Sequence, residues 1–424
     1  MQIVVMISII LICSAVISQA QILDYRGSFV DEATRSDPNT ATALNEGNHL
    51  LPQPRWTNIG TASLSLGLEP VSTTIGLSTT TTSLVNPTYS ASIHELAADL
   101  SLSDDLNLLV GKKILKWGTG YAFNPTGVVE PPRSPSDPTD RLNQNDGRTL
   151  ISLTAFLGKN SLTFVYLNDV QISIGSFKWN TSEYAFRAYA FLDGLDLSLV
   201  GHYREGDRLQ AGANCSYVIG EGLELHGEVL AQQGSSMVYH PILQSDNSQQ
   251  TFTSYPYVPL YDHSGRVFAR TLVGGQYTFD NGINVVLEYS HNGEGLSRKE
   301  WQRWMNFVTF QNDVQQGRLP APKELVSLSG TNLLWALNTL SPRGTMRDYL
   351  FGRGYWSDDR WSIETLIFMN ADDASMVIIP AVTLKVSKYA SLYTRFTSYL
   401  GSRGTEFGSL FTRASLSLGL QVQI

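Results

Sequence analysis

The chain has 424 residues, 42% of them apolar and only 16% charged, and 30 basic against 38 acidic side chains give a net charge of −8. Because soluble proteins usually contain about 25% charged residues, the low charge favours a β-rich chain over a helical bundle, as do the 35 glycines. The mild acidity argues against a nucleic-acid partner, which would require a basic surface.

The N-terminus has the pattern of a secretory signal peptide. The first twenty residues carry no charged side chain, and their apolar run ends in Ser18-Gln19-Ala20. Small residues at the ends of such a triplet are typical of a cleavage site, so we predict a signal peptide over residues 1–20. A permanent membrane anchor is the alternative, since the run is near the lower length limit for spanning a bilayer. Cleavage would remove Cys13 and leave Cys215 alone, which excludes a disulfide and any cysteine-based metal or haem site.

Residues 21–55 are polar, acidic in places and without periodicity. We expect this segment to form a periplasmic extension or a short plug, and residues 56–424 to form the main domain.

From residue 56 onward, apolar residues recur at every second position. The C-terminus is the best example, since leucines 416, 418 and 420 alternate with serine, glycine and glutamine. Alternation gives each strand one apolar and one polar face, a pattern shared by soluble β-sandwiches and by barrels. Tight turns at 158–160, 193–194, 220–222 and 280–282 alternate with long loops near 118–146, 234–265 and 294–345.

Short turns on one rim and long loops on the other are typical of an outer-membrane barrel, which must close because no strand edge can face lipid unpaired. The predicted fold is therefore all-β, a single transmembrane antiparallel β-barrel of about 16 strands, an even number as bacterial barrels require. A further pair at 71–82 and 170–178 would make about 18. The 16 strands are expected near 57–69, 88–102, 105–117, 147–157, 161–168, 183–192, 194–204, 207–219, 222–233, 266–279, 283–293, 346–356, 360–370, 374–386, 388–400 and 410–424.

The segment 296–317 departs from this pattern and is predicted to be helical, because Trp301, Trp304 and Phe307 would share one face. The simplest interpretation is a helix in an external loop that packs on the rim. The alternative is a gating or partner-binding element.

The segment 111–120 reads GKKILKWGTG, and Asn124-Pro125 follows it. A strand ending in glycine, basic residues, isoleucine and a Trp-Gly pair, before a loop with Asn-Pro, resembles a pattern in porin-like outer-membrane β-barrel channel proteins of Gram-negative bacteria. The resemblance implies that one long loop folds into the lumen and narrows it. The alternative is an external loop that lies over the mouth.

A loop in the lumen must hold its shape without a strand ladder, and its prolines would help by fixing φ. Its charges of both signs would create a transverse field where solute passes. The residues expected to form this constriction are Lys116, Trp117, Tyr121, Asn124, Glu130, Arg133, Asp137, Asp140, Arg141, Asp146 and Arg148.

If the apolar face of each strand contacts lipid, the polar face lines an aqueous lumen. The alternative is a closed lumen in which the same groups pair with one another. The predicted lumen-lining residues are Arg187, Asp196, His202, Arg204, Glu224, His226, Glu228, Arg270, Glu288, Arg360, Glu364, Lys385, Arg395 and Arg413.

The sequence therefore predicts a channel of the bacterial outer membrane for passive diffusion of ions or small hydrophilic solutes. No nucleophile elbow, phosphate loop or metal-ligand spacing is recognisable, so we expect no enzyme activity, cofactor or metal. Two alternatives remain: a barrel that sheathes a partner, such as a redox or periplasmic protein, and a substrate-specific transporter with an N-terminal plug. Outer-membrane lipid is the expected surrounding, and assembly into a homo-oligomer is left open.

Overall fold

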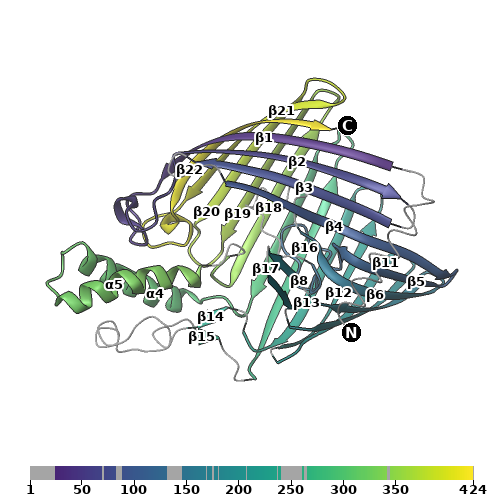
Figure 1. Ribbon diagram of the computed structural model, residues 1–424, viewed down its shortest axis with the longest axis horizontal. Helices are drawn as coiled ribbons and strands as arrows, with labels where there is room; N and C mark the ends of the chain where they lie inside the picture. The colour runs from purple at the N-terminus through teal and green to yellow at the C-terminus, as the bar shows by residue number, and fades with distance from the viewer. Residues whose placement is uncertain are drawn as a thin grey trace.

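The computed structural model describes residues 24–68, 71–82, 88–130, 146–168, 170–173, 176–179, 181–206, 208–235, 237–239, 260–261, 265–340 and 344–423. Eighteen antiparallel strands form one closed sheet (Figure 1). The predicted signal peptide, residues 1–20, lies outside the described residues. The barrel strands are β1 (Asp24–Pro38), β2 (Trp56–Leu68), β3 (Val71–Thr82), β4 (Thr88–Ser103), β5 (Leu106–Lys113), β6 (Arg148–Leu157), β7 (Asn160–Leu167), β10 (Glu183–Leu192), β11 (Leu195–Arg204), β12 (Arg208–Ile219), β13 (Leu223–Gln233), β16 (Val267–Thr278), β17 (Asn284–Asn292), β18 (Asp348–Ser357), β19 (Trp361–Asn370), β20 (Met376–Lys385), β21 (Ala390–Leu400) and β22 (Thr412–Gln423).

The barrel closes between its first and last strands. Phe29 of β1 lies opposite Ala62 of β2 on one side and Val422 of β22 on the other. The prediction that residues 21–55 form an extension or plug is therefore wrong for residues 24–38, which are part of the wall. The outward-facing residues of β1 include the charged Asp31 and Arg35, so this strand lacks the apolar alternation by which the other strands were recognised.

The strand number is 18, so the preferred value of 16 is wrong and the alternative is confirmed. The two additional strands are β1 and β3. The segment 170–178 contributes none, because β8 (Val170–Ser173) and β9 (Ser176–Trp179) pair only with each other in the described residues. A second small hairpin joins β14 (Val238–Tyr239) and β15 (Leu260–Tyr261). The strand predicted over 105–117 ends at Lys113.

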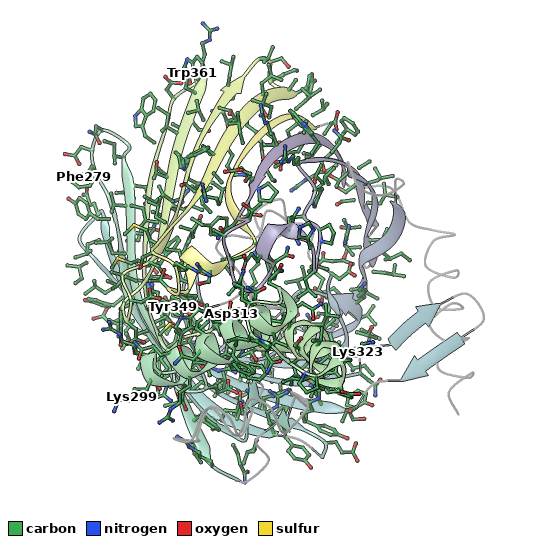
Figure 2. All side chains as sticks on the ribbon, turned by 90° about the vertical axis from the view of Figure 1, so that its left-hand side faces the viewer. Phe279, Lys299, Asp313, Lys323, Tyr349 and Trp361 are labelled. Carbon is green, nitrogen blue, oxygen red and sulfur yellow. The ribbon has the colours of Figure 1, made fainter. Side chains whose placement is uncertain are left out.

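The two faces of the wall differ as the alternation predicts. On β13, Leu225 and Val229 are exposed on the outside, whereas His226 and Glu228 are buried on the inside. Figure 2 shows Phe279 and Trp361 on the outside of the barrel, where both are exposed. An apolar belt on the outside and polar side chains within are the features that a bilayer imposes on a barrel.

The two rims also differ as predicted. Gly158, Gly194, Gly220 and Gly282 adopt positive φ in turns of one rim, a conformation that only glycine adopts without strain. Asp24 and Gln423, the ends of the first and last strands, lie at this rim. The long connections between β5 and β6 and between β17 and β18 begin and end at the opposite rim.

The longest connection contains two helices, α4 (Arg298–Gln315) and α5 (Lys323–Ala336), which lie beyond the long-loop rim at the left of Figure 1. The predicted helix over 296–317 is confirmed as α4, with Trp301, Trp304 and Phe307 buried. Helix α5 was not predicted, because serines, a threonine and Gly330 give its sequence a weak helix propensity. No helix in the described part of the chain is long and apolar enough to cross a bilayer.

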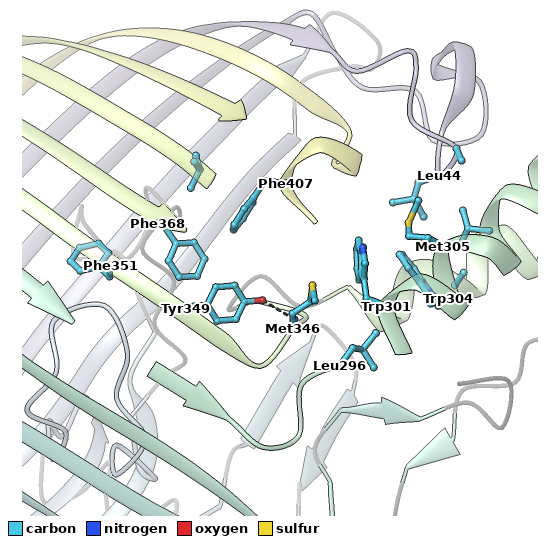
Figure 3. Packing of buried hydrophobic residues seen from close by; sticks show 14 of the residues in the cluster. Leu44, Leu296, Trp301, Trp304, Met305, Met346, Tyr349, Phe351, Phe368 and Phe407 are labelled. Carbon is cyan, nitrogen blue, oxygen red and sulfur yellow. Dashed lines mark hydrogen bonds between the residues drawn. The ribbon is translucent and has the colours of Figure 1, made fainter. Parts of the chain in front are cut away.

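Helix α4 rests on an apolar cluster that continues into the barrel (Figure 3). The rings of Tyr349 and Phe368 stack with centroids 4.8 Å apart, and Phe407 meets Phe368 edge-on at 5.4 Å. The Nε1 of Trp301 donates to the carbonyl of Gly404 over 2.7 Å. The helical connection is therefore seated on the long-loop rim at the side of β18 and β19.

Candidate functional site

The chain between β5 and β6 enters the barrel and follows its inner wall. We call residues 114–130 the inner loop. It leaves β5, the fifth strand around the barrel, and the Tyr121 ring stacks on Phe351 of β18, the fourteenth, at 5.6 Å. These strands are nine apart in a ring of eighteen, so the inner loop reaches the opposite side of the barrel. This agrees with the prediction that the segment folds into the lumen.

Glu228, in the middle of β13, is the first anchor of the inner loop. Its Oε1 accepts hydrogen bonds from the backbone N–H groups of Thr119, at 2.5 Å, and Gly120, at 2.8 Å. Its Oε2 accepts from the N–H and the hydroxyl of Thr126, both at 2.7 Å. Hydrogen bonds to an ionised carboxylate are about twice as strong as neutral ones, so this side chain holds two turns of the loop together.

Two further carboxylates complete the attachment. Glu288 of β17 accepts from the N–H groups of Tyr121 and, at 2.9 Å, Ala122. Glu130, on the loop itself, accepts from the N–H groups of Trp117 and, at 2.7 Å, Gly118. Seven backbone N–H groups of the inner loop thus point at three carboxylates, which satisfies donors that no strand partner could reach.

Close packing also explains why glycine occupies two positions of the Trp-Gly-Thr-Gly sequence. A Cβ atom at Gly120 would lie 2.1 Å from the carbonyl oxygen of Phe123 and 2.8 Å from a Leu272 methyl group of the wall. A Cβ atom at Gly118 would lie 2.7 Å from the Cβ of Asn124. The glycines let the backbone approach the carboxylates closely.

Apolar packing supports the polar attachment. Trp117 and Val129 are buried against wall residues of β6, β7, β10, β11 and β13. Asn214 of β12 donates to the carbonyl of Trp117 over 2.9 Å and to the hydroxyl of Thr126 over 2.6 Å. The described part of the inner loop is therefore a fixed lining of one half of the wall.

The structure places the other predicted constriction residues in different ways. Asn124 donates to Glu130 over 2.8 Å, whereas Lys116 is exposed. Asp146 lies beside His94 and Lys112 near the end of β5, outside the attachment. The remaining members of the predicted set lie outside the described residues: Arg133, Asp137, Asp140 and Arg141.

Several predicted lumen residues form a hydrogen-bonded belt below the long-loop rim. Glu183 binds Arg148 at 2.9 Å and His202 at 2.9 Å, and Arg204 lies 3.7 Å away. The belt then continues across neighbouring strands through His202–Gln210, Gln210–Gln232, Gln232–Glu294 and Glu294–Arg270.

Other predicted lumen residues face inward as separate pairs. Arg187 donates to Ser198 over 3.0 Å, and Asp196 accepts from the hydroxyl of Tyr189. His226 lies 3.0 Å from Glu288, and Glu224 is half-buried on the same face of β13. Two more ion pairs join Glu364 to Arg353 at 2.7 Å and Arg395 to Glu32 at 2.7 Å.

Three predicted lumen residues lie elsewhere. Arg360 is in the turn between β18 and β19, and the ammonium of Lys385 donates to the carbonyl of Asp358 in the same turn, over 2.8 Å. Arg360 is a turn residue, so its assignment to the lumen wall is wrong, because alternation does not distinguish the last residues of a strand from its turn. Lys385 is the last residue of β20 and lies at the short-turn rim. Arg413, near the start of β22, is exposed.

Four further charged residues take part in these ion pairs although they were not predicted: Glu32, Glu183, Glu294 and Arg353. The alternation of β18 contained the signal for Arg353, because Leu350 faces outward and Tyr349 and Phe351 face inward. Glu32 could not be found, since its strand was not recognised.

Two carboxyl groups, those of Glu46 and Glu406, hold the long-loop connections in place by hydrogen bonds. The hydrogen bonds from Arg318, at 2.7 and 2.8 Å, and from Asn312 lower the pKa of Glu46 to about 2. Burial raises the pKa of Glu406, although its carboxyl accepts from Thr345 N–H at 2.7 Å and Asn370 at 2.6 Å.

A closed antiparallel barrel with an apolar exterior, a polar interior and an inward-folded loop defines the class of transmembrane β-barrels. No family model and no curated protein matches the sequence. Among solved structures, OccK5 (OpdH) of Pseudomonas aeruginosa is similar over 95% of this chain and 98% of its own, with a TM-score of 0.53 and 10% identity.

OccAB1 of Acinetobacter baumannii matches over 96% of this chain and 98% of its own, with a TM-score of 0.52 and 12% identity. The outer membrane protein opdK from Pseudomonas aeruginosa matches over 95% and 99%, with a TM-score of 0.50 and 9% identity. These likenesses extend over nearly the whole of each chain and establish the fold, which agrees with the resemblance to porin-like barrels found in the sequence.

Proposed function

We propose that the protein is a channel of the bacterial outer membrane for passive diffusion of ions or small hydrophilic solutes. The observation that carries the proposal is the pairing of a closed sheet, apolar outside and polar inside, with a loop fastened along one half of its inner wall. A barrel that only anchored a protein in the membrane would need no carboxylates to hold a loop inside it.

The location follows from the exterior. Bulky apolar side chains such as Phe164, Leu287 and Leu418 are exposed around the barrel, and burying them in hydrocarbon would contribute about 25 cal/mol per Å². The similarity to a protein described as an outer membrane protein supports the same location.

The inner loop would act as the constriction. It occupies space along the walls of β6 to β18, and its attachment to Glu228 and Glu288 would keep that space constant over time. Solute would then pass between Tyr121, which is exposed, and the half of the wall that the described inner loop does not contact.

The plug hypothesis loses its main segment, because residues 24–38 are wall. The sheath hypothesis requires room for a second polypeptide, which the inner loop would reduce. The channel is therefore the function that the geometry supports best.

The test is single-channel recording with the purified, refolded protein in a planar bilayer under a salt gradient. Folding is checked by heat-modifiable gel migration, and protein denatured before addition is the control. We expect steady conductance steps with a defined reversal potential. A folded barrel that gives no steps would contradict the proposal.

A further inference from the structure

The half of the wall across from the inner loop presents hydroxyl groups to the lumen. Strand pairing places them on the inner face of β1, β2 and β3, whereas neighbouring residues such as Phe29 and Leu64 face outward. We call the four half-buried residues that bond in two pairs the hydroxyl strip. They are Ser28, Ser63, Ser65 and Thr74.

The hydroxyls of the strip bind one another across the strands. The hydroxyl oxygens of Ser28 and Ser63 are 2.7 Å apart, and those of Ser65 and Thr74 are 3.0 Å apart. The neighbouring pair of Thr34 and Ser417 is not part of the strip, because Ser417 is buried and the Thr34 hydroxyl donates to Glu32 over 3.2 Å. A hydroxyl offers one donor and two acceptor sites and rotates freely. Each pair uses one donor and one acceptor internally, so each retains a donor and acceptor sites for a solute.

Charge within the strip is compensated. Glu32 shares the inner face of β1 with Ser28 and Thr34, and both its oxygens accept from Arg395, at 2.7 and 2.8 Å. Tyr393 adds a third hydrogen bond at 2.8 Å. A carboxylate and a guanidinium that are buried together neutralise each other, so the pair offers little net attraction to an ion.

The wall opposite the hydroxyl strip differs from it because it carries charged side chains. It holds Glu228 and Glu288 at the inner loop, and Arg187 and Arg353 face the lumen nearby. An ion that moved along the hydroxyl strip would give up water for neutral hydroxyls alone, which is costly without a counter-charge. A neutral solute rich in hydroxyls would exchange its water for groups of equal hydrogen-bonding type.

The spacing of the strip suits such a solute. Neighbouring strands are about 4.8 Å apart, and alternate residues such as Ser63 and Ser65 are about 6.8 Å apart along a strand. Hydroxyl groups at this spacing can form hydrogen bonds with hydroxyls on both edges of one sugar ring. Repetition over three strands would let a solute exchange partners as it moves.

We propose that the hydroxyl strip is a track for uncharged polyhydroxylated solutes, that is, neutral sugars and polyols. The inference rests on the proposed channel function and names its preferred class of solute.

The test compares uptake of glucose with uptake of gluconate and protonated glucosamine, its charged analogues of similar size, by liposomes containing the full protein. The wild type should take up glucose fastest. In the variant Ser28→Ala/Ser63→Ala, glucose uptake should fall about fivefold, as expected for the loss of one net hydrogen bond. Potassium chloride conductance should stay the same.

The matched control is Thr154→Val/Thr163→Val, which removes a hydroxyl pair of 3.1 Å on β6 and β7, on the side that the inner loop covers. Its glucose uptake should equal that of the wild type. A conducting barrel with equal glucose and gluconate uptake, or equal losses in both variants, would overturn the track but leave the channel. A folded barrel without conductance would overturn the channel itself.

Discussion

The attachment of the inner loop can be tested by a single atom exchange in Glu228→Gln. The change preserves shape but removes the charge and places an NH₂ group against the N–H donors of Thr119 and Gly120 or of Thr126. One buried N–H left unpaired costs about 2 kcal/mol, and each of two remaining bonds loses about 1 kcal/mol when the acceptor becomes neutral. The attachment should therefore weaken by about 4 kcal/mol, close to a thousandfold in the opening equilibrium.

The assay is amide hydrogen exchange of residues 117–126 in the folded barrel, together with single-channel current noise. Glu224→Gln is the matched control, because Glu224 lies on the same face of the same strand, four residues away. We expect faster exchange and noisier current in Glu228→Gln alone. Equal protection in both variants and the wild type would refute the assignment of Glu228 as an anchor.

Three further outcomes follow from the structure. The variant Gly120→Ala should also release the inner loop, because its Cβ would lie 2.1 Å from a backbone oxygen. The control Gly354→Ala has open space around its Cβ and should leave the loop in place. Amide hydrogen exchange of the inner loop distinguishes the two variants. Asp31→Leu should stabilise the barrel by about 1 kcal/mol, since a carboxylate on the lipid face is unfavourable, and an unchanged or lower urea midpoint would contradict this. Because the pKa of Glu46 is lowered, its contact with Arg318 stabilises the connection fully above the ordinary pKa of 4.5, and this stabilisation is lost as the pH falls toward about 2. The current noise should therefore rise between these pH values. The variant Glu46→Gln should abolish this pH dependence.

Much of the wall was predictable from residues 56–423 because alternation is a local property of a strand. It placed His226 and Glu228 inside and Leu225 outside without knowledge of any neighbour. The tight turns were predictable as well, since Gly158, Gly194, Gly220 and Gly282 lie in them and have positive φ. Helix α5 and strand β1 were not predictable, because their own sequences are weak and their partners supply the stability.

By itself the sequence determined the class of fold and the inward and outward faces of most strands, whereas it left open whether the segment after β5 enters the lumen or lies over the mouth. Tertiary structure alone decided that Glu32 meets Arg395 across 363 positions and that Glu228 meets Thr119 across 109. The physical reason is closure: which wall side chain faces which loop N–H depends on the strand number and on the pairing of β1 with β22. The two-residue alternation of the sequence contains no information about the strand number or about that pairing.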